Sequence, residues 1–216
     1  MQRIVFLLLN SLLFSACLSK VSENRIMPYY NQPDFTPVFI ENIANVKQSI
    51  THQIGDFSLL NQDSNLVTQT VFRNKIHVAN FIFTTCGSIC PVMTQNFKIV
   101  ADSLKNDSAV ILLSYSVTPW IDQPSVLKNY RKKNGINHPN WQFLTGDRTL
   151  IYKLARQSYF AEEDLGFSKD SSQFLHTEHF ILVDKTKRIR GVYNGTLRLE
   201  MHHLIEDIKS LEKETE

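Results

Sequence analysis

The 216-residue chain has little of several features that mark particular classes of protein. Its 7 glycines are too few for a sandwich or barrel built from many tight turns. Its formal net charge is only +2 and it contains no long basic run, which argues against nucleic-acid binding. With 43% hydrophobic and 20% charged residues, the composition is that of ordinary globular material, enough for one well-packed domain and some additional chain.

The N-terminus carries a targeting segment. Arg3 supplies a positive charge, and the apolar stretch at residues 4–14 is too short to span a bilayer comfortably. It ends in Phe-Ser-Ala-Cys, which resembles the lipobox of bacterial lipoproteins, so residues 1–16 are predicted to be a signal peptide and Cys17 the lipidated residue. The alternative is an ordinary signal peptide or short anchor with an incidental Cys17. Both interpretations predict a membrane-anchored or exported domain on the periplasmic side, where a dithiol can be oxidised.

The segment at residues 17–50 shows little periodicity and contains Pro28, Pro33 and Pro37. Such a segment is typical of a tether that holds a domain away from a membrane surface. Residues 51–216 are expected to form the folded domain.

Regular hydrophobic patterns begin at residue 54. The patterns predict strands at residues 56–60, 67–70, 78–83, 110–117, 142–144, 180–184 and 188–193. They predict helices at residues 91–105, 124–133, 147–156 and 197–211, with Asp122 as a possible cap of the second and Gly135 as its stop. This order is that of an α/β, thioredoxin-like fold with an N-terminal β-hairpin extension and an insertion.

Only three cysteines occur in the chain, and two of them lie within five positions, at Cys86 and Cys90. They are expected where the strand at residues 78–83 runs into the next helix, a place where exposed amides and the helix dipole favour thiolates. A Cys-x-x-Cys pair would indicate a thioredoxin-type oxidoreductase. The third intervening residue suits capture of a soft cation such as Cu(I) at least as well as disulfide exchange. A structural disulfide, or two unrelated buried cysteines, is the alternative.

Two thiolates usually need a third ligand, and histidine is the natural candidate. His176 and His179 flank the start of the strand at 180–184, near where a thioredoxin-like fold has its cis-proline loop facing the dithiol. No proline occurs there, so a histidine in that loop could complete a Cys-Cys-His site. The remaining histidines are expected on the surface or without direction toward the cysteines: His52, His77, His138, His202 and His203.

Several segments resemble the motifs of the Sco/SenC family. Residues 85–91 (TCGSICP) resemble its Thr/Ser-Cys-x-x-x-Cys-Pro signature, and residues 114–130 and 141–147 look like its second and third blocks. His176-Thr177 resembles the His-Thr/Ser element before its penultimate strand pair. The match covers roughly residues 50–210. The chain departs from the family at Thr118, where Asp is frequent, and at His179, where an apolar residue is common.

The resemblance implies a membrane-tethered, thioredoxin-fold copper protein. Members of the family deliver copper to, or reduce the cysteines of, the binuclear copper site of cytochrome c oxidase. Carried over to this chain, Cys86, Cys90 and His176 would be the copper ligands, and His176 is preferred to His179 because of its spacing to the strand. The expected partners are the copper-site subunit of the oxidase or another copper protein, with the domain itself monomeric.

The leading hypothesis is therefore a copper-binding assembly factor and not a turnover enzyme. The first alternative is a thiol–disulfide oxidoreductase in which Cys86 attacks and Cys90 resolves. A peroxiredoxin-like peroxidase is a weaker alternative, because Thr84-Thr85-Cys86 lacks the proline that those enzymes place before the peroxidatic cysteine.

Overall fold

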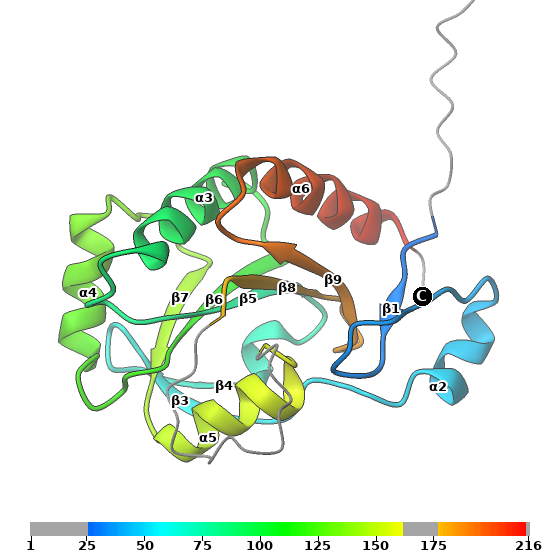
Figure 1. The fold of residues 1–216 in the computed structure, drawn as a ribbon, viewed down its shortest axis with the longest axis horizontal. Helices are drawn as coiled ribbons and strands as arrows, with labels where there is room; N and C mark the ends of the chain where they lie inside the picture. The colour runs from blue at the N-terminus through cyan, green and yellow to red at the C-terminus, as the bar shows by residue number, and fades with distance from the viewer. Residues whose placement is uncertain (1–25, 162–176, 215–216) are drawn as a thin grey trace, which may run out of the picture.

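The computed structural model describes residues 26–161 and 177–214. Within these residues the strands form one sheet in the order β2-β1-β9-β8-β5-β6-β7-β3-β4, with helices on both faces (Figure 1). The strands are β1 (Tyr29–Tyr30), β2 (Pro37–Val38), β3 (Ser58–Asn61), β4 (Leu66–Thr68), β5 (Ile76–Ile82), β6 (Val110–Ser116), β7 (Trp141–Thr145), β8 (His179–Val183) and β9 (Ile189–Asn194). The helices are η1 (Ile43–Asn45), α2 (Val46–Ser49), η2 (Gln69–Phe72), α3 (Ile89–Ser103), α4 (Pro124–Lys133), α5 (Arg148–Lys153), the π-helical turn η3 (Leu154–Ser158) and α6 (Arg198–Lys213).

The expected α/β, thioredoxin-like order is confirmed. Strands β5, β6 and β7 run parallel, and β8 and β9 form an antiparallel pair beside β5. The predicted hairpin is β3–β4, which extends the sheet beyond β7. Since β5 and β6 are parallel and in register from Ile76↔Val110 to Ile82↔Ser116, their carboxyl ends meet at one edge of the sheet.

The central strand β5 is buried at every residue, as its continuous apolar run predicts for a strand covered on both faces. Its side chains alternate between two hydrophobic clusters. Val78 packs in the cluster formed with α3 and α6, whereas Ala79 packs in the cluster formed with α5 and η3. Figure 1 shows α3 and α6 on one side of the sheet and α5 on the other.

The N-terminal part of the described chain differs from the predicted tether. Residues 27–50 include β1, which pairs with β9, and both Met27 and Ile50 are at most 1% exposed. Side chains of β9 and the turn before it hold this segment, since Arg190 Nη2 donates to Met27 O at 3.1 Å and Arg188 Nε donates to Ile50 O at 3.1 Å. Hydrophobic periodicity could not predict these contacts, because strands β1 and β2 are only two residues long and the segment is held by arginines far away in the sequence.

Candidate metal centre

Cys86 and Cys90 lie together at the junction of β5 and α3. The Cys86 amide donates to Phe83 O at 3.2 Å, which closes a turn directly after the strand. Helix α3 begins at Ile89, so Cys90 lies in its first turn, and its amide donates to Cys86 Sγ at 3.4 Å. Both cysteines are free thiols. The predicted strand–helix placement of the pair is observed, and the helix start points a backbone donor at one of the sulfurs.

The two sulfurs differ in exposure and in acidity. Cys86 is half-buried, and although burial raises its pKa, hydrogen bonds from the Cys90 and Ser88 amides and side chains lower that pKa overall, to about 7. Cys90 is 3% exposed, and burial, together with the neighbouring Cys86 sulfur and the charge of Asp122, raises its pKa to about 12. Near neutral pH the pair therefore presents one accessible sulfur with thiolate character and one buried thiol that keeps its proton.

A buried carboxylate supports the loop that carries the cysteines. Asp122 is 0% exposed and accepts hydrogen bonds from Thr84 N at 3.2 Å, Thr84 Oγ1 at 2.5 Å, Ser116 Oγ at 2.7 Å and Thr118 Oγ1 at 2.9 Å. The prediction that Asp122 caps α4 is wrong, because Gln123 occupies the cap position. The donors from the ends of two parallel strands instead hold this carboxylate between them, which fixes Thr84 two residues before Cys86.

Asp122 is thus a supporting residue whose role the sequence analysis missed. A signal was available in the topology, since Thr84 and Asp122 follow neighbouring parallel strands and are expected at the same sheet edge. Thr118, where the Sco/SenC pattern often has Asp, is one of the donors to this carboxylate. Threonine at position 118, in place of aspartate, therefore donates a hydrogen bond to Asp122 and avoids a second buried carboxylate beside it.

His176 lies outside the described residues, so its role as a ligand stays a prediction. The chain two residues later is well fixed: Gly195 N donates to Glu178 O at 2.7 Å, and Asn194 Nδ2 donates to Glu178 Oε1 at 2.7 Å. Asn96 of α3 in turn donates from Nδ2 to Gly195 O at 2.9 Å. The strand entry that follows His176 is therefore anchored to the same helix that begins at the cysteines.

His179 has a different environment. Its ring lies edge-on to Phe35, with the ring centroids 5.8 Å apart. Phe35 packs against the cluster of the α5 face, whereas Phe180, the next residue in β8, packs with α3 on the face of Cys90. The alternation of the strand thus directs His179 away from the cysteine face.

The donor set suits a soft metal ion. Two adjacent cysteine sulfurs favour Cu(I), and an added imidazole would also suit Cu(II). Within residues 26–161 and 177–214, no three side chains of His, Cys, Asp or Glu come together as a metal site. The described residues thus bring two of the expected ligands together, and the third expected ligand, His176, lies outside them.

The comparisons with known proteins agree with this geometry. Residues 45–213 match the SCO1/SenC family model. The chain is 30% identical over 167 residues to the SCO1 protein homolog of Bacillus subtilis, covering 76% of this chain and 86% of that one.

In the described part of the chain, every helix is too short or too polar to cross a bilayer.

Three solved structures of Sco proteins are also similar to this chain. BsSco, described as a member of the Sco family of cytochrome c oxidase assembly proteins with a disulfide switch, is 29% identical with a TM-score of 0.64, covering 76% of this chain and 95% of that one. A SCO1/SenC family lipoprotein from Bacillus anthracis is 28% identical with a TM-score of 0.65, covering 75% of this chain and 96% of that one. ScoI of Bradyrhizobium japonicum, solved with copper bound, is 26% identical with a TM-score of 0.58, covering 73% of this chain and 98% of that one. The fold, the cysteine pair and these matches show that the chain belongs to the SCO1/SenC family.

Proposed function

We propose that this protein binds one copper ion as cargo and delivers it to the copper site of cytochrome c oxidase during assembly of that enzyme. The observation that carries the proposal is the pair of free thiols at the β5–α3 junction, with the Cys90 amide donating to Cys86 Sγ. Family membership and the copper-bound relative support it. The ligands proposed are Cys86, Cys90 and His176.

The unequal thiols suggest an order for loading and release. Cys86 is the more exposed and the more acidic sulfur, so an incoming ion would meet it first. Binding to Cys90 requires loss of a proton that burial otherwise holds on the sulfur, which makes copper affinity rise with pH. Release to a partner would proceed in reverse, with Cys90 reprotonated as the ion leaves through the accessible side.

The third ligand is proposed to be His176. Asn96 follows Cys90 by six residues, which is about 9 Å along the axis of α3. Glu178 is tied through Gly195 to Asn96, so the entry to β8, two residues after His176, is attached to the helix that begins at the cysteines, which supports His176 as the third ligand. The orientation of His179 toward Phe35 favours His176 over its neighbour.

The site of action follows from the N-terminal segment. Residues 1–16 are proposed to be a signal peptide and Cys17 the lipid anchor, which would hold the domain at the periplasmic face of a bacterial membrane as a monomer. A lipoprotein relative from Bacillus anthracis supports this proposal. Labelling with a radioactive fatty acid should mark the natural protein and not Cys17→Ala, and equal labelling of both would contradict the anchor.

The same dithiol could exchange with the cysteines of another protein, but the named relatives favour the copper function. The decisive test is restoration of oxidase activity in a bacterium that lacks its own Sco protein. The natural chain should restore activity and the copper content of the oxidase, whereas Cys86→Ala at the same expression level should restore neither. Full restoration by Cys86→Ala would overturn the proposal.

A further inference from the structure

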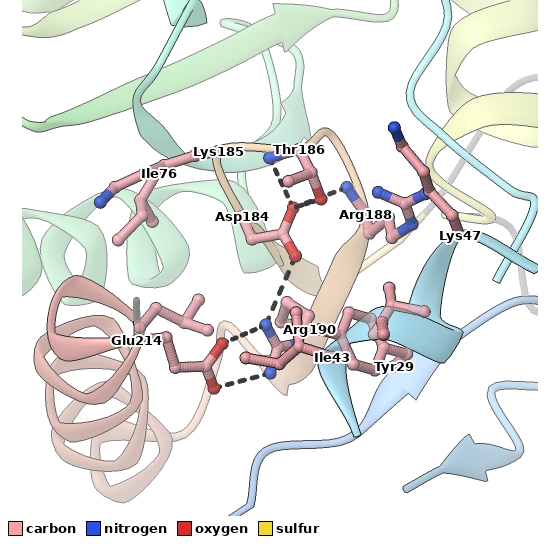
Figure 2. A pocket seen from close by; sticks show the side chains of 13 residues that line it. Tyr29, Ile43, Lys47, Ile76, Asp184, Lys185, Thr186, Arg188, Arg190 and Glu214 are labelled. Carbon is pink, nitrogen blue, oxygen red and sulfur yellow. Dashed lines mark hydrogen bonds and ion pairs between the residues drawn. The ribbon is translucent and has the colours of Figure 1, made fainter. Parts of the chain in front are cut away.

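A cavity of about 410 Å³ lies at the end of the sheet opposite the cysteines. Ile76, the first residue of β5, lines it, whereas Cys86 follows the last residue of that strand. The turn between β8 and β9, the end of α6 and the N-terminal segment close its other sides (Figure 2). Apolar side chains form much of the lining: Tyr29, Ile43, Val46, Ile76 and Leu211. The volume is within the usual range of small-molecule sites.

The charged side chains around this cavity do not balance. Four cationic groups and two carboxylates line it, which leaves a net charge of +2: Lys47, Lys185, Arg188 and Arg190 against Asp184 and Glu214. Arg190 already neutralises much of the acidic charge, because its Nη1 and Nη2 contact the Glu214 carboxylate at 2.7 and 2.8 Å and Nη1 lies 3.4 Å from Asp184 Oδ2 (Figure 2). The excess positive charge therefore resides on the other three cations.

Arg188 is the cationic group of this cavity whose hydrogen-bonding capacity is least used. It is 6% exposed, and its Nε donates to Ile50 O at 3.1 Å. Among the residues that the structure describes, its two terminal nitrogens have no hydrogen-bond partner and no carboxylate within 4.0 Å. These nitrogens are not sealed from solvent but face the open space of the cavity, where an anion bound by both would accept charge-assisted hydrogen bonds. In Figure 2 the ammonium group of Lys47 is drawn on the same side of the cavity as this guanidinium.

We propose that this cavity binds an anionic amphiphile, with a phosphate or carboxylate head on Arg188 and Lys47 and a short apolar body against Ile43, Val46 and Leu211. The chemistry is shared by the head-group region of a phospholipid and by a soluble alkyl phosphate or carboxylate. The site is independent of the proposed copper function, since it lies at the other end of β5. A ligand there would bridge the N-terminal segment to the core, because Lys47 and Val46 belong to α2 and Arg188 precedes β9.

Calorimetric titration of the full chain with hexyl phosphate tests the site. We expect saturable binding at one site, at least about tenfold weaker in Arg188→Met, which loses the charge-assisted hydrogen bonds. Lys47→Met should weaken binding about threefold, as expected for an exposed cation. Since Arg188→Met also loses the bond to Ile50, Lys47→Met tests the site without touching a buried contact. Arg198→Met, on the exposed start of α6 and outside the lining, is the matched control and should bind as the natural chain does.

Two further titrants separate the sources of the ligand. Inorganic phosphate should bind at least about tenfold more weakly than hexyl phosphate, because it leaves the apolar lining in contact with water. Dihexanoyl phosphatidylglycerol below its micelle concentration supports a lipid ligand if it binds more tightly than hexyl phosphate, and a soluble ligand if it binds more weakly. Absence of saturable hexyl phosphate binding, equal binding by Lys47→Met and Arg198→Met, or equal affinity for inorganic phosphate would overturn the proposal.

Discussion

The backbone amide of Cys90 donates a hydrogen bond to Cys86 Sγ across 3.4 Å, at the first turn of α3. This contact makes the two cysteines chemically unequal, because it favours the thiolate of Cys86 while Cys90 itself is buried. In the proposed copper site, the accessible sulfur would make the first contact with the ion and the buried sulfur would secure it after losing a proton.

The first prediction concerns thiol reactivity. Alkylation of Cys86 by iodoacetamide should accelerate as pH rises through about 7, not through the value near 9 of an ordinary thiol, because only the thiolate reacts. Cys90 should stay unmodified below pH 10, since its pKa is about 12 and it is buried. Mass spectrometry of peptides from the reduced, metal-free protein measures the alkylation rates of both cysteines. The Cys90→Ser variant gives the rate of Cys86 alone. Faster labelling of Cys90 than of Cys86 would contradict the assignment.

The second prediction concerns Asp122. Asp122→Asn places an amide nitrogen among four donors and removes a buried charge, so the free energy of unfolding should fall by about 2 kcal/mol. The pKa of Cys90 should also fall, because the Asp122 charge contributes to raising it. Urea denaturation and thiolate absorbance measure the two effects.

Asp63→Asn is the matched control for that variant. Asp63 is a half-exposed carboxylate that pairs with Lys128 at 3.0 Å, so its loss should cost less than about 1 kcal/mol and leave the thiols unchanged. If Asp122→Asn behaves like Asp63→Asn in both measurements, the carboxylate does not support the cysteine loop.

The third prediction concerns stability in acid. Burial lowers the pKa of His77 to about 3, and its ring stacks on Phe72 with Nε2 3.1 Å from Tyr159 Oη. Below pH 6.5 the unfolded chain takes up a proton that the folded ring does not, so this residue reduces stability as pH falls from 6.5 toward 3. The loss should be about 2 kcal/mol at pH 5. In denaturation curves at pH 7 and pH 5, the free energy of unfolding of the natural chain should therefore fall by about 2 kcal/mol relative to that of His77→Gln, because the other titrating groups act alike in both proteins.

Replacement of an exposed histidine provides the comparison for His77. His202 lies on the solvent side of α6, and His202→Gln should retain the full pH dependence of the natural protein. An equal pH dependence in the natural chain and in His77→Gln would contradict the assignment to His77.

The fourth prediction tests the anchor of the strand entry after His176. A Cβ at Gly195 would lie 2.6 Å from Phe180 Cε1 and 2.9 Å from Glu178 O, so Gly195→Ala should displace Glu178 and weaken copper binding about tenfold or more. Among the residues that the structure describes, none has a heavy atom within 4 Å of a Cβ added at Gly87, so Gly87→Ala is the matched control. Competition with a Cu(I) chelator measures both affinities. Equal affinities would show that the position of this strand entry does not matter for the metal.

The core of this fold could be predicted from the sequence because its signals are local. The apolar run of β5, the helical period after Pro91 and the alternation of β8 each depend on neighbouring residues, and all three elements are observed. The placement of Cys86 and Cys90 follows from the same local signals, since a strand ends and a helix begins around them.

The remaining features depend on contacts between distant residues. Arg190 holds the N-terminal segment through Pro28 and Met27, more than 160 positions away, and no periodicity records such a bond. Asp122 resembled a helix cap because helix starts favour acidic residues, but the donors that determine its role come from two strand ends. The cavity beside Arg188 is likewise assembled from four separate segments.

Anaerobic titration of the reduced protein with Cu(I) tests the central claim most directly, with His176→Ala and His179→Ala measured in parallel. The natural chain should bind one equivalent, His179→Ala should match it, and His176→Ala should bind at least about tenfold more weakly because two sulfurs remain without the third ligand. Loss of binding in His179→Ala with retention in His176→Ala, or no binding by the natural chain, would contradict the proposed copper site.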